Sequence, residues 1–320
     1  MSKLTKIISR QVSRGGLTWL ESVRLGEFPW LVHAFSTRHG GVSQAPCAGL
    51  NLGFTGSDRR ERVEQNRHQF FSQLGGNTFI PCSTHQVHSS HSIVVGRNIA
   101  NGLTYRLPTV EACLPPSASP PAGDGLVTSE PGILLTIRIA DCLPVLLVDS
   151  RRRVVAAVHA GWRGALARVI EKAVGDMRSV FASDPQEVIA VLGPSIRSCC
   201  YEVGEEVVEA FYGKFTSAER FFQTLPNRAE AITDRHSILF LSAYPPGHAP
   251  EHVPAARLNL IAVAQDQLSS AGLLPENILV ADYCTACRTD LFFSHRREGG
   301  VTGRQVAAIG IRPLGDRVIR

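Results

Sequence analysis

Three apolar segments in the middle of the chain constrain the fold more than any other feature of the sequence. Residues 133–139, 143–148 and 154–158 are rich in leucine, isoleucine and valine, and only a few residues separate them. Uninterrupted apolar runs of this length are typical of strands that are buried on both faces. Residues 164–180 follow with apolar positions at helical spacing, and hairpin-like pairs of strands also occur. The pattern therefore predicts a mixed α/β fold.

Shorter segments extend this pattern along the chain. The sequence predicts further helices over 57–74, 203–211 and 256–271, and strands within 29–54, 79–95, 188–192, 277–282 and 306–311. Residues 97–121 contain five prolines and little periodicity, which predicts a surface insertion loop. We expect one main domain over 30–312, an N-terminal extension over 1–29 and a C-terminal tail over 313–320.

Charge and cysteine content narrow the class of protein. The 33 Lys and Arg residues exceed the 28 Asp and Glu residues by 5, spread along the chain, so a nucleic-acid partner has little support. The most apolar run, 132–148, contains Arg138 and Asp141, which excludes a membrane span. The eight cysteines lie in a chain that is long enough to fold without disulfides and shows no secretory segment. We therefore expect free thiols and a cytoplasmic location; nothing in the sequence fixes an oligomeric state.

The strongest local motif is His-Ala-Gly-Trp-Arg-Gly at 159–164. His159 falls at the end of a predicted strand, where open α/β sheets place their binding sites. Gly161 and Gly164 allow close approach of the backbone, Arg163 adds a cationic fork, and the start of the predicted helix favours an anion. The alternative is a tight turn with a hydrogen-bonded histidine that has no chemical role.

Two further segments carry metal-ligating side chains. Cys142 follows Asp141 at a break between two apolar runs, and histidines occur at 85, 88 and 91. Two imidazoles and one thiolate resemble the three-ligand sets of catalytic zinc sites. The same atoms could instead form a nucleophile–base pair of Cys142 and His159, which needs no metal. An inert buried thiol is the simplest alternative for Cys142 alone.

Cys284 and Cys287 form a Cys-x-x-Cys motif near the C-terminus. A structural zinc site would need a second pair, and only the adjacent Cys199 and Cys200 offer one. The sequence therefore favours incidental cysteines over a second metal site.

Several longer motifs occur in order along the chain. They include FSTRHGGVS at 35–43, HQVH at 85–88, ADCLPVLLVD at 140–149, AAVHAGWRG at 156–164 and FFSHRREGGVTGRQ at 292–305. On these motifs the chain resembles the YfiH family, also called the multicopper polyphenol oxidase or laccase-domain family and now the purine nucleoside phosphorylase family. The resemblance implies a single α/β domain with mixed β-sheets sandwiched by helices, in a cysteine-hydrolase-like superfamily.

The same resemblance implies a function and a site. It implies zinc, with copper as the alternative ion, bound by His88, Cys142 and His159. It implies phosphorolysis of adenosine, inosine and S-methyl-5′-thioadenosine, so that purine nucleosides and phosphate are the partners, with adenosine deamination as a side reaction. The catalytic candidates are Cys142, His159, Arg163 and Asp141. The candidates for binding substrate and phosphate are Arg163, Arg38, Arg296 and Asp124, with Asp124 and Asp141 also suited to ligand support or proton transfer.

Three rival functions remain open at this stage. A laccase would need many copper-binding histidines in His-x-His pairs, and none of the 11 histidines forms such a pair. A cysteine or zinc hydrolase that edits cell-wall precursors would use Cys142 as nucleophile or ligand. A scaffold that binds nucleosides without turnover is the non-enzymatic alternative.

Overall fold

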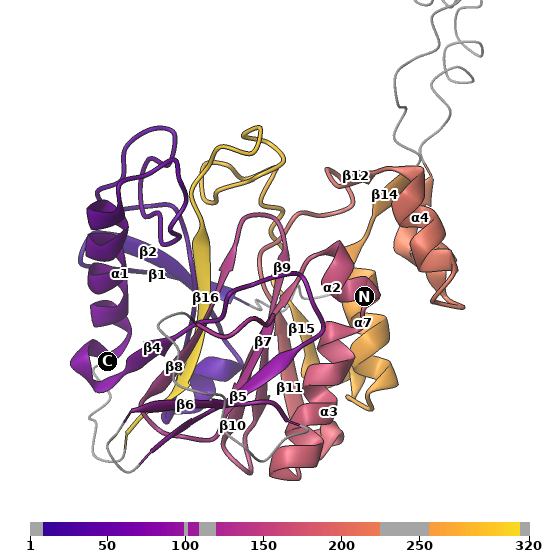
Figure 1. Cartoon of the computed structure of the whole chain (residues 1–320), viewed down its shortest axis with the longest axis horizontal. Helices are drawn as coiled ribbons and strands as arrows, with labels where there is room; N and C mark the ends of the chain where they lie inside the picture. Colours follow the sequence, from indigo (N-terminus) through magenta and orange to yellow (C-terminus); the bar gives the residue numbers. More distant parts are fainter. Residues whose placement is uncertain (1–8, 99–101, 109–119, 225–255, 314–320) are drawn as a thin grey trace, which may run out of the picture.

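Two large β-sheets pack face to face and form the centre of the molecule, with helices on their outer faces (Figure 1). The computed structural model describes residues 9–98, 102–108, 120–224 and 256–313. The first sheet has the order β1 (Ser9–Arg14), β2 (Leu17–Ser22), β3 (Leu31–Ser36), β16 (Gln305–Ile311), β8 (Ile133–Ile139) and β4 (Ile80–Cys82). Its neighbouring strands are antiparallel except for the parallel pair β4 and β8.

The second large sheet is also mixed. Its order is β15 (Ile278–Val280), β11 (Val188–Leu192), β9 (Leu143–Asp149), β10 (Val154–Ala160), β7 (Gly125–Thr128), β5 (Ser92–Arg97) and β6 (Leu103–Arg106). The pairs β11–β15 and β5–β7 are parallel. A small third sheet contains β12 (Glu202–Val203), β14 (Ala256–Leu258) and β13 (Phe222–Thr224).

The helices cover the outer faces of the two large sheets. In the described part of the chain the α-helices are α1 (Arg60–Gly75), α2 (Trp162–Leu166), α3 (Val169–Phe181), α4 (Glu205–Tyr212) and α7 (Leu260–Ser270). Short 3-10 helices span η1 (Leu25–Glu27), η2 (Gly76–Thr78), η3 (Pro185–Glu187), η4 (Ala218–Phe221) and η5 (Pro275–Asn277). Helix α1 packs on the first sheet, whereas α3 and α7 pack on the second (Figure 1). Among the described residues, no helix has the length and apolar content needed to cross a bilayer.

The central strands have apolar residues on both faces because each face meets another layer. In β8, Leu135 packs between the two sheets, whereas Leu134 packs toward α1. In β10, Val155 faces the first sheet, whereas Val158 faces α3 and α7. This layering explains the apolar runs at 133–158. The predicted single-domain α/β fold, with mixed sheets between helices, is confirmed.

The helix predicted over 164–180 is wrong in one respect, because it is divided into α2 and α3. Arg168 adopts a left-handed conformation with φ of 60° between them. The buried Gln267 of α7 stabilises this break: its Nε2 donates to the carbonyl of Ala165 at 2.7 Å, and its Oε1 accepts from the amide of Ile170 at 3.3 Å. One side chain thus pairs the free backbone groups of both helix ends. Apolar periodicity could not show a partner about 100 residues away.

Three other predicted segments differ in detail. Residues 97–121 were expected to form a loop, but they contain β6, which pairs antiparallel with β5. Residues 99–101 and 109–119 of this segment lie outside the described part of the chain. The helix expected over 256–271 begins only at Leu260, because β14 precedes it and Asn259 caps it by accepting from the amide of Ala262. Residues 9–22, expected in an N-terminal extension, form β1 and β2, which continue the first sheet beyond β3.

A buried histidine in β3 makes stability depend on pH. His33 is 4% exposed, and its Nε2 accepts from the amide of Ser22 at 2.8 Å, so the ring is neutral. Burial lowers its pKa to about 4. Between pH 4 and 6.5 the unfolded chain therefore binds more protons than the folded chain, and the free energy of unfolding falls as pH is lowered. We expect a loss of about 3 kcal/mol across this window, complete below pH 4.

Urea unfolding of wild type and His33→Gln at pH 7 and pH 5 measures this contribution. The variant should show a clearly smaller loss of stability between these pH values, because a glutamine does not titrate. His68→Gln, which replaces an exposed histidine of α1, should keep the wild-type pH dependence. Equal pH dependence in wild type and His33→Gln would contradict the assignment.

Candidate metal centre

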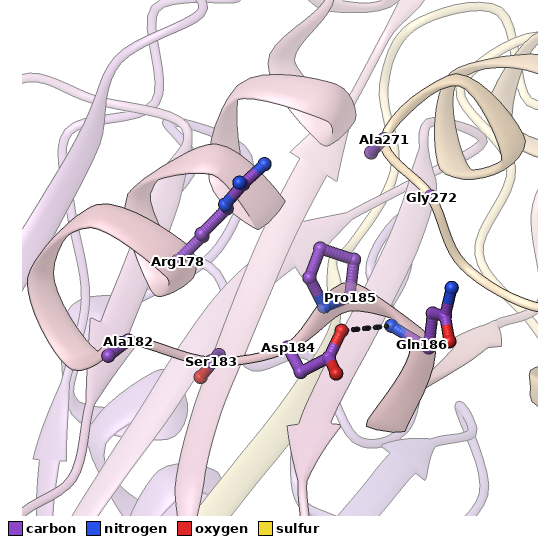
Figure 2. Close-up of a pocket in the computed structure, with 8 residues that line it drawn as sticks. All are labelled: Arg178, Ala182, Ser183, Asp184, Pro185, Gln186, Ala271 and Gly272. Atoms are coloured by element: carbon purple, nitrogen blue, oxygen red, sulfur yellow. Dashed lines mark hydrogen bonds between the residues drawn. The ribbon is translucent and has the colours of Figure 1, made fainter.

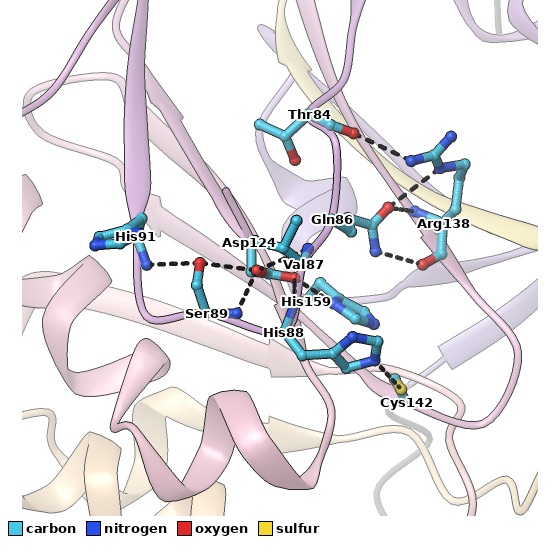
Figure 3. Close-up of polar contacts among 10 residues, drawn as sticks. All are labelled: Thr84, Gln86, Val87, His88, Ser89, His91, Asp124, Arg138, Cys142 and His159. Carbon is cyan, nitrogen blue, oxygen red and sulfur yellow. Dashed lines mark hydrogen bonds and ion pairs between the residues drawn. The ribbon is translucent and has the colours of Figure 1, made fainter. Parts of the chain in front are cut away.

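Three side chains from separate segments meet at one end of the two large sheets (Figure 3). His88 lies in the loop between β4 and β5, Cys142 lies in the turn between β8 and β9, and His159 lies near the end of β10. The ligand atoms of all three lie within 4.8 Å of one another, and Cys142 Sγ is 3.9 Å from His88 Nε2. His159 is opposite Pro144 in the β9–β10 register, which brings it next to the turn that carries Cys142. This set can hold a metal ion. His85 and His91 are exposed and do not belong to it.

Asp124, which precedes β7, fixes the position of two of these ligands (Figure 3). Its carboxylate is completely buried. Its Oδ1 accepts from His159 Nδ1 at 2.9 Å and from the His88 amide at 3.0 Å. Its Oδ2 accepts from the Val87 amide and from both the amide and the hydroxyl of Ser89. With Nδ1 of His159 bonded to the carboxylate, Nε2 remains available for a metal. This placement suits support of ligands rather than the phosphate contact expected from the sequence.

The electrostatics of the centre favour a thiolate. Burial alone would raise the pKa of Cys142, but the charges and hydrogen bonds of His159 and His88 outweigh it and lower the pKa to about 6. For His159, burial lowers the pKa, but the Cys142 thiolate and Asp124 raise it to about 9. Burial would raise the pKa of Asp124, but hydrogen bonds from His159 and Ser89 lower it to about 2. In the absence of a metal, the three groups therefore form an ionised chain from thiolate to imidazolium to carboxylate.

The loop that carries His88 is held against the end of β8. The side chain of Gln86 bonds to the backbone of Arg138 in both directions, accepting from its amide at 2.9 Å and donating to its carbonyl at 2.8 Å. The Arg138 guanidinium donates to the carbonyl of Thr84 at 3.1 Å. Gln86 thus acts as an additional strand partner. Neither residue was predicted from the sequence to take part in the site, although Gln86 lies inside the HQVH motif.

Asp141 connects the turn of Cys142 to two other loops. Its Oδ1 accepts from the Thr285 hydroxyl at 2.6 Å, and its Oδ2 accepts from the Arg296 amide at 2.7 Å. It has a φ of 86°, and His88 has a φ of 59°. Both values are uncommon for residues other than glycine, and such strained residues cluster at functional sites. Because both carboxylate oxygens of Asp141 are bonded within the protein, we assign it to positioning Cys142 rather than to proton transfer.

Gly161 leaves space that two candidate ligands occupy. A Cβ at this position would lie 2.7 Å from His88 Cδ2 and 3.1 Å from Cys142 Sγ. The Gly161→Ala variant should therefore displace the His88 ring and weaken metal binding by about tenfold or more, as expected when ligand orientation is disturbed. Competition with a chromogenic chelator measures the affinity. Gly175→Ala, in an open position of α3, is the matched control and should bind metal as wild type does.

The arginines expected at a phosphate site differ in how far other groups of the protein engage their guanidinium groups. Arg38 is 3.1 Å from Glu298 and lies over the ring of Phe293, so its guanidinium is partly engaged. Arg163 is exposed and stacks on Trp162, but α2 has only five residues and offers little helix dipole. Arg296 is exposed and lies near the ring of Tyr201, with a distance of 5.6 Å from Cζ to the centroid, and its Nη2 donates to the carbonyl of Glu202 at 2.8 Å.

Tyr201 and Arg304 also lie beside the centre, although neither was among the candidate site residues predicted from the sequence. Burial raises the pKa of Tyr201, and the charge of Cys142 raises it further, so its hydroxyl stays protonated near the thiolate. Burial lowers the pKa of the Arg304 guanidinium, which interacts electrostatically with Cys142 and Asp141. Arg304 directly precedes β16, and its proximity to Cys142 depends on how β16 and β8 are paired.

A surface hollow of about 510 Å³ lies far from this chemistry (Figure 2). It is formed where α3 ends and where the turn after α7 begins, and it includes Arg178 and Asp184. The Asp184 carboxylate accepts from the amide of Gln186 at 3.1 Å. Since β11 starts there and pairs with the far end of β9, the hollow is at the opposite end of the sheet from Cys142. It therefore contributes nothing to the candidate centre.

The fold and the centre define a class of protein: a single-domain α/β protein with two histidines and one cysteine that could hold a metal ion at one end of its stacked sheets. The family model described as "Multi-copper polyphenol oxidoreductase laccase" matches residues 32–312, and the chain belongs to this family. The match covers nearly all of the domain expected over 30–312.

Named relatives and solved structures agree with this membership. The purine nucleoside phosphorylase YlmD of Geobacillus stearothermophilus is 31% identical over 309 residues, which cover 95% of this chain and 97% of that protein. The purine nucleoside phosphorylase YfiH of Shigella flexneri is 34% identical over 274 residues, which cover 86% and 91%. The crystal structure of the hypothetical protein YfiH of Bacillus licheniformis superposes with a TM-score of 0.75 at 26% identity, covering 94% of this chain and 99% of that chain.

Proposed function

We propose that this protein is a zinc-dependent purine nucleoside phosphorylase that cleaves adenosine, inosine and S-methyl-5′-thioadenosine with phosphate. The observation that carries the proposal is the convergence of His88, Cys142 and His159 on one point, with Asp124 bonded behind His159. The names of the relatives support the reaction class. The nitrogen and sulfur donor set suits zinc, which takes three such ligands in catalytic sites and keeps one position open.

The reaction sets three requirements for the site. An oxygen of phosphate forms a bond to C1′ of the ribose, while the bond from C1′ to the purine nitrogen breaks and leaves its electrons on the base. As in other glycosyl transfers, we expect an oxocarbenium-like transition state. The site must hold an anion near C1′, donate a hydrogen bond or proton to the leaving purine, and exclude water. When bound by His88, Cys142 and His159, zinc supplies a fixed positive charge at this point.

Residues around the centre can meet the first two requirements. Exposed guanidinium groups of Arg163 and Arg296, with the half-buried Arg304, are the proposed holders of phosphate. Arg38 is less suited because Glu298 engages it. The protonated hydroxyl of Tyr201 is the proposed donor to the leaving purine, since burial and the neighbouring thiolate keep its pKa raised.

A phosphate-dependent assay of base release tests the proposal. Purified protein of known metal content is incubated with each of the three nucleosides, with and without phosphate, under air and without oxygen. Release of free base and pentose 1-phosphate that requires phosphate and not oxygen is expected. In the adenosine reaction, inosine formation would reveal the proposed side deamination. Turnover that depends on oxygen would instead support the oxidase described by the family name.

One observation favours a second candidate function, a cysteine hydrolase. Cys142, His159 and Asp124 lie in the order of a nucleophile, a base and a carboxylate that orients the base. This reading predicts activity that chelators leave intact and thiol alkylation abolishes. The phosphorylase proposal predicts the opposite result for both reagents. Chelators should remove activity, and bound zinc should shield Cys142 from alkylation.

A further inference from the structure

Four cysteine side chains converge at a second place, outside the candidate metal centre. Cys199 and Cys200 follow β11, and Cys284 and Cys287 follow β15. Because β11 and β15 are parallel neighbours, the two segments leave the sheet at the same edge. The four Sγ atoms lie within 4.8 Å of one another, and Cys287 Sγ is 3.5 Å from that of Cys199 and 3.4 Å from that of Cys200. All four are free thiols.

We propose that these four cysteines form a second metal site, which holds a structural zinc ion or a similar thiophilic divalent cation. In a tetrahedral site with zinc–sulfur bonds of about 2.3 Å, neighbouring sulfurs are about 3.8 Å apart. The observed separations are close to this value, so a small adjustment places all four sulfurs around one ion. A complete set of four protein ligands leaves no open position, which is typical of structural rather than catalytic zinc.

The surroundings of the cluster suit a negatively charged tetrathiolate. The amide of Arg197 donates to Cys284 Sγ at 3.4 Å. The Arg197 guanidinium interacts electrostatically with Asp282 and also with Cys284 and Cys199, while Nε donates to the carbonyl of Tyr283 and Nη2 to that of Ala281. Its buried Nη1 has no hydrogen-bond partner within the described part of the chain. Thiolates around a metal would give this N–H an acceptor and would add to the negative charge that Asp282 already places near this cation.

A metal at this position would also brace the candidate metal centre. Thr285 lies between two of the four cysteines, and its hydroxyl donates to Asp141, the residue before Cys142. Tyr201, the proposed donor to the leaving purine, directly follows Cys200. An ion that joins the two segments therefore fixes the loops on one side of the centre. Its role is mechanical, because the structure gives it no contact with the three ligands of the first site.

Metal analysis of the full chain tests the second site without relying on activity. Wild-type protein purified with zinc should contain about two ions per chain. Cys142→Ser should keep the ion of the four-cysteine site, the double variant Cys284→Ser and Cys287→Ser should keep the other ion, and the triple variant should keep none. A wild-type protein with a single zinc ion that Cys142→Ser removes completely would overturn the proposal.

Cobalt replacement gives an independent readout that does not require the double variant to fold. Cobalt-loaded Cys142→Ser should show the strong sulfur-to-metal absorption of a tetrahedral tetrathiolate site. Adding Cys47→Ser, which removes a buried thiol outside the cluster, should leave this absorption unchanged. Three results would overturn the proposal: no such absorption, a disulfide revealed by two missing thiols in the denatured protein, or acid-labile sulfide from an iron–sulfur cluster.

Discussion

The His88→Ala and Cys142→Ala variants are each expected to lose the metal of the candidate centre, with phosphorolysis falling by at least about a hundredfold. Each removes one of only three protein ligands, so the remaining pair cannot hold the ion tightly. His88 is exposed and its backbone amide still bonds to Asp124, so its side chain can be removed without opening the core. Metal content and phosphate-dependent release of purine should decline together.

A neighbouring histidine provides the matched control for this experiment. His85 is exposed, lies three positions earlier in the same loop and does not belong to the ligand set. His85→Ala should keep both the metal and the activity. If Cys142→Ala retains full metal content and full phosphorolysis, the ligand assignment is wrong. If it loses activity while the wild-type protein needs no metal, Cys142 acts as a nucleophile and not as a metal ligand.

Asp124→Asn is expected to have the second largest effect. Each carboxylate oxygen accepts from at least two donors, so the amide group of an asparagine must face two N–H or O–H groups whichever way it is placed. Metal affinity should fall by about 10- to 100-fold, because His159 and the His88 loop lose their fixed orientation. The free energy of unfolding should fall by about 3 kcal/mol, as for a buried charge network that loses one partner.

Another buried aspartate separates the two effects. Asp149 is also buried and accepts from two backbone amides, but it lies at the far end of β9 from Cys142. Asp149→Asn should lower stability by about 1 kcal/mol and leave metal affinity unchanged. Chelator competition and urea unfolding measure both quantities in each variant. An Asp124→Asn protein that is destabilised but binds metal as wild type does would reduce Asp124 to a structural residue.

The sequence predicted the layers of the fold better than the connections between them. Apolar runs at 133–158 identified the central strands because these strands are buried on both faces. The interruption between α2 and α3 was missed because its cause, Gln267, lies on another helix. β6 was missed because a short edge strand in a proline-rich segment has no strong pattern of its own.

In the candidate site too, the sequence predicted what short motifs contain but not the contacts between residues far apart along the chain. Motifs identified His88, Cys142 and His159, and the resemblance to a family grouped them into one ligand set. The support given by Asp124 and Gln86 depends on which loops lie side by side, which spacing along the chain does not reveal. For the same reason the four cysteines were taken as incidental, although parallel pairing of β11 and β15 brings residues about 87 positions apart into contact.

The position of β16 in the first sheet has a consequence for how the protein is made. This strand, at 305–311, lies between β3 and β8 and bonds to both, so the sheet remains split until these residues have left the ribosome. Until then, two long apolar edges lack a partner and are open to association with other nascent chains. We therefore expect that synthesis halted before residue 305 yields fragments that are prone to aggregate, because they lack the strand that joins the two halves of the sheet.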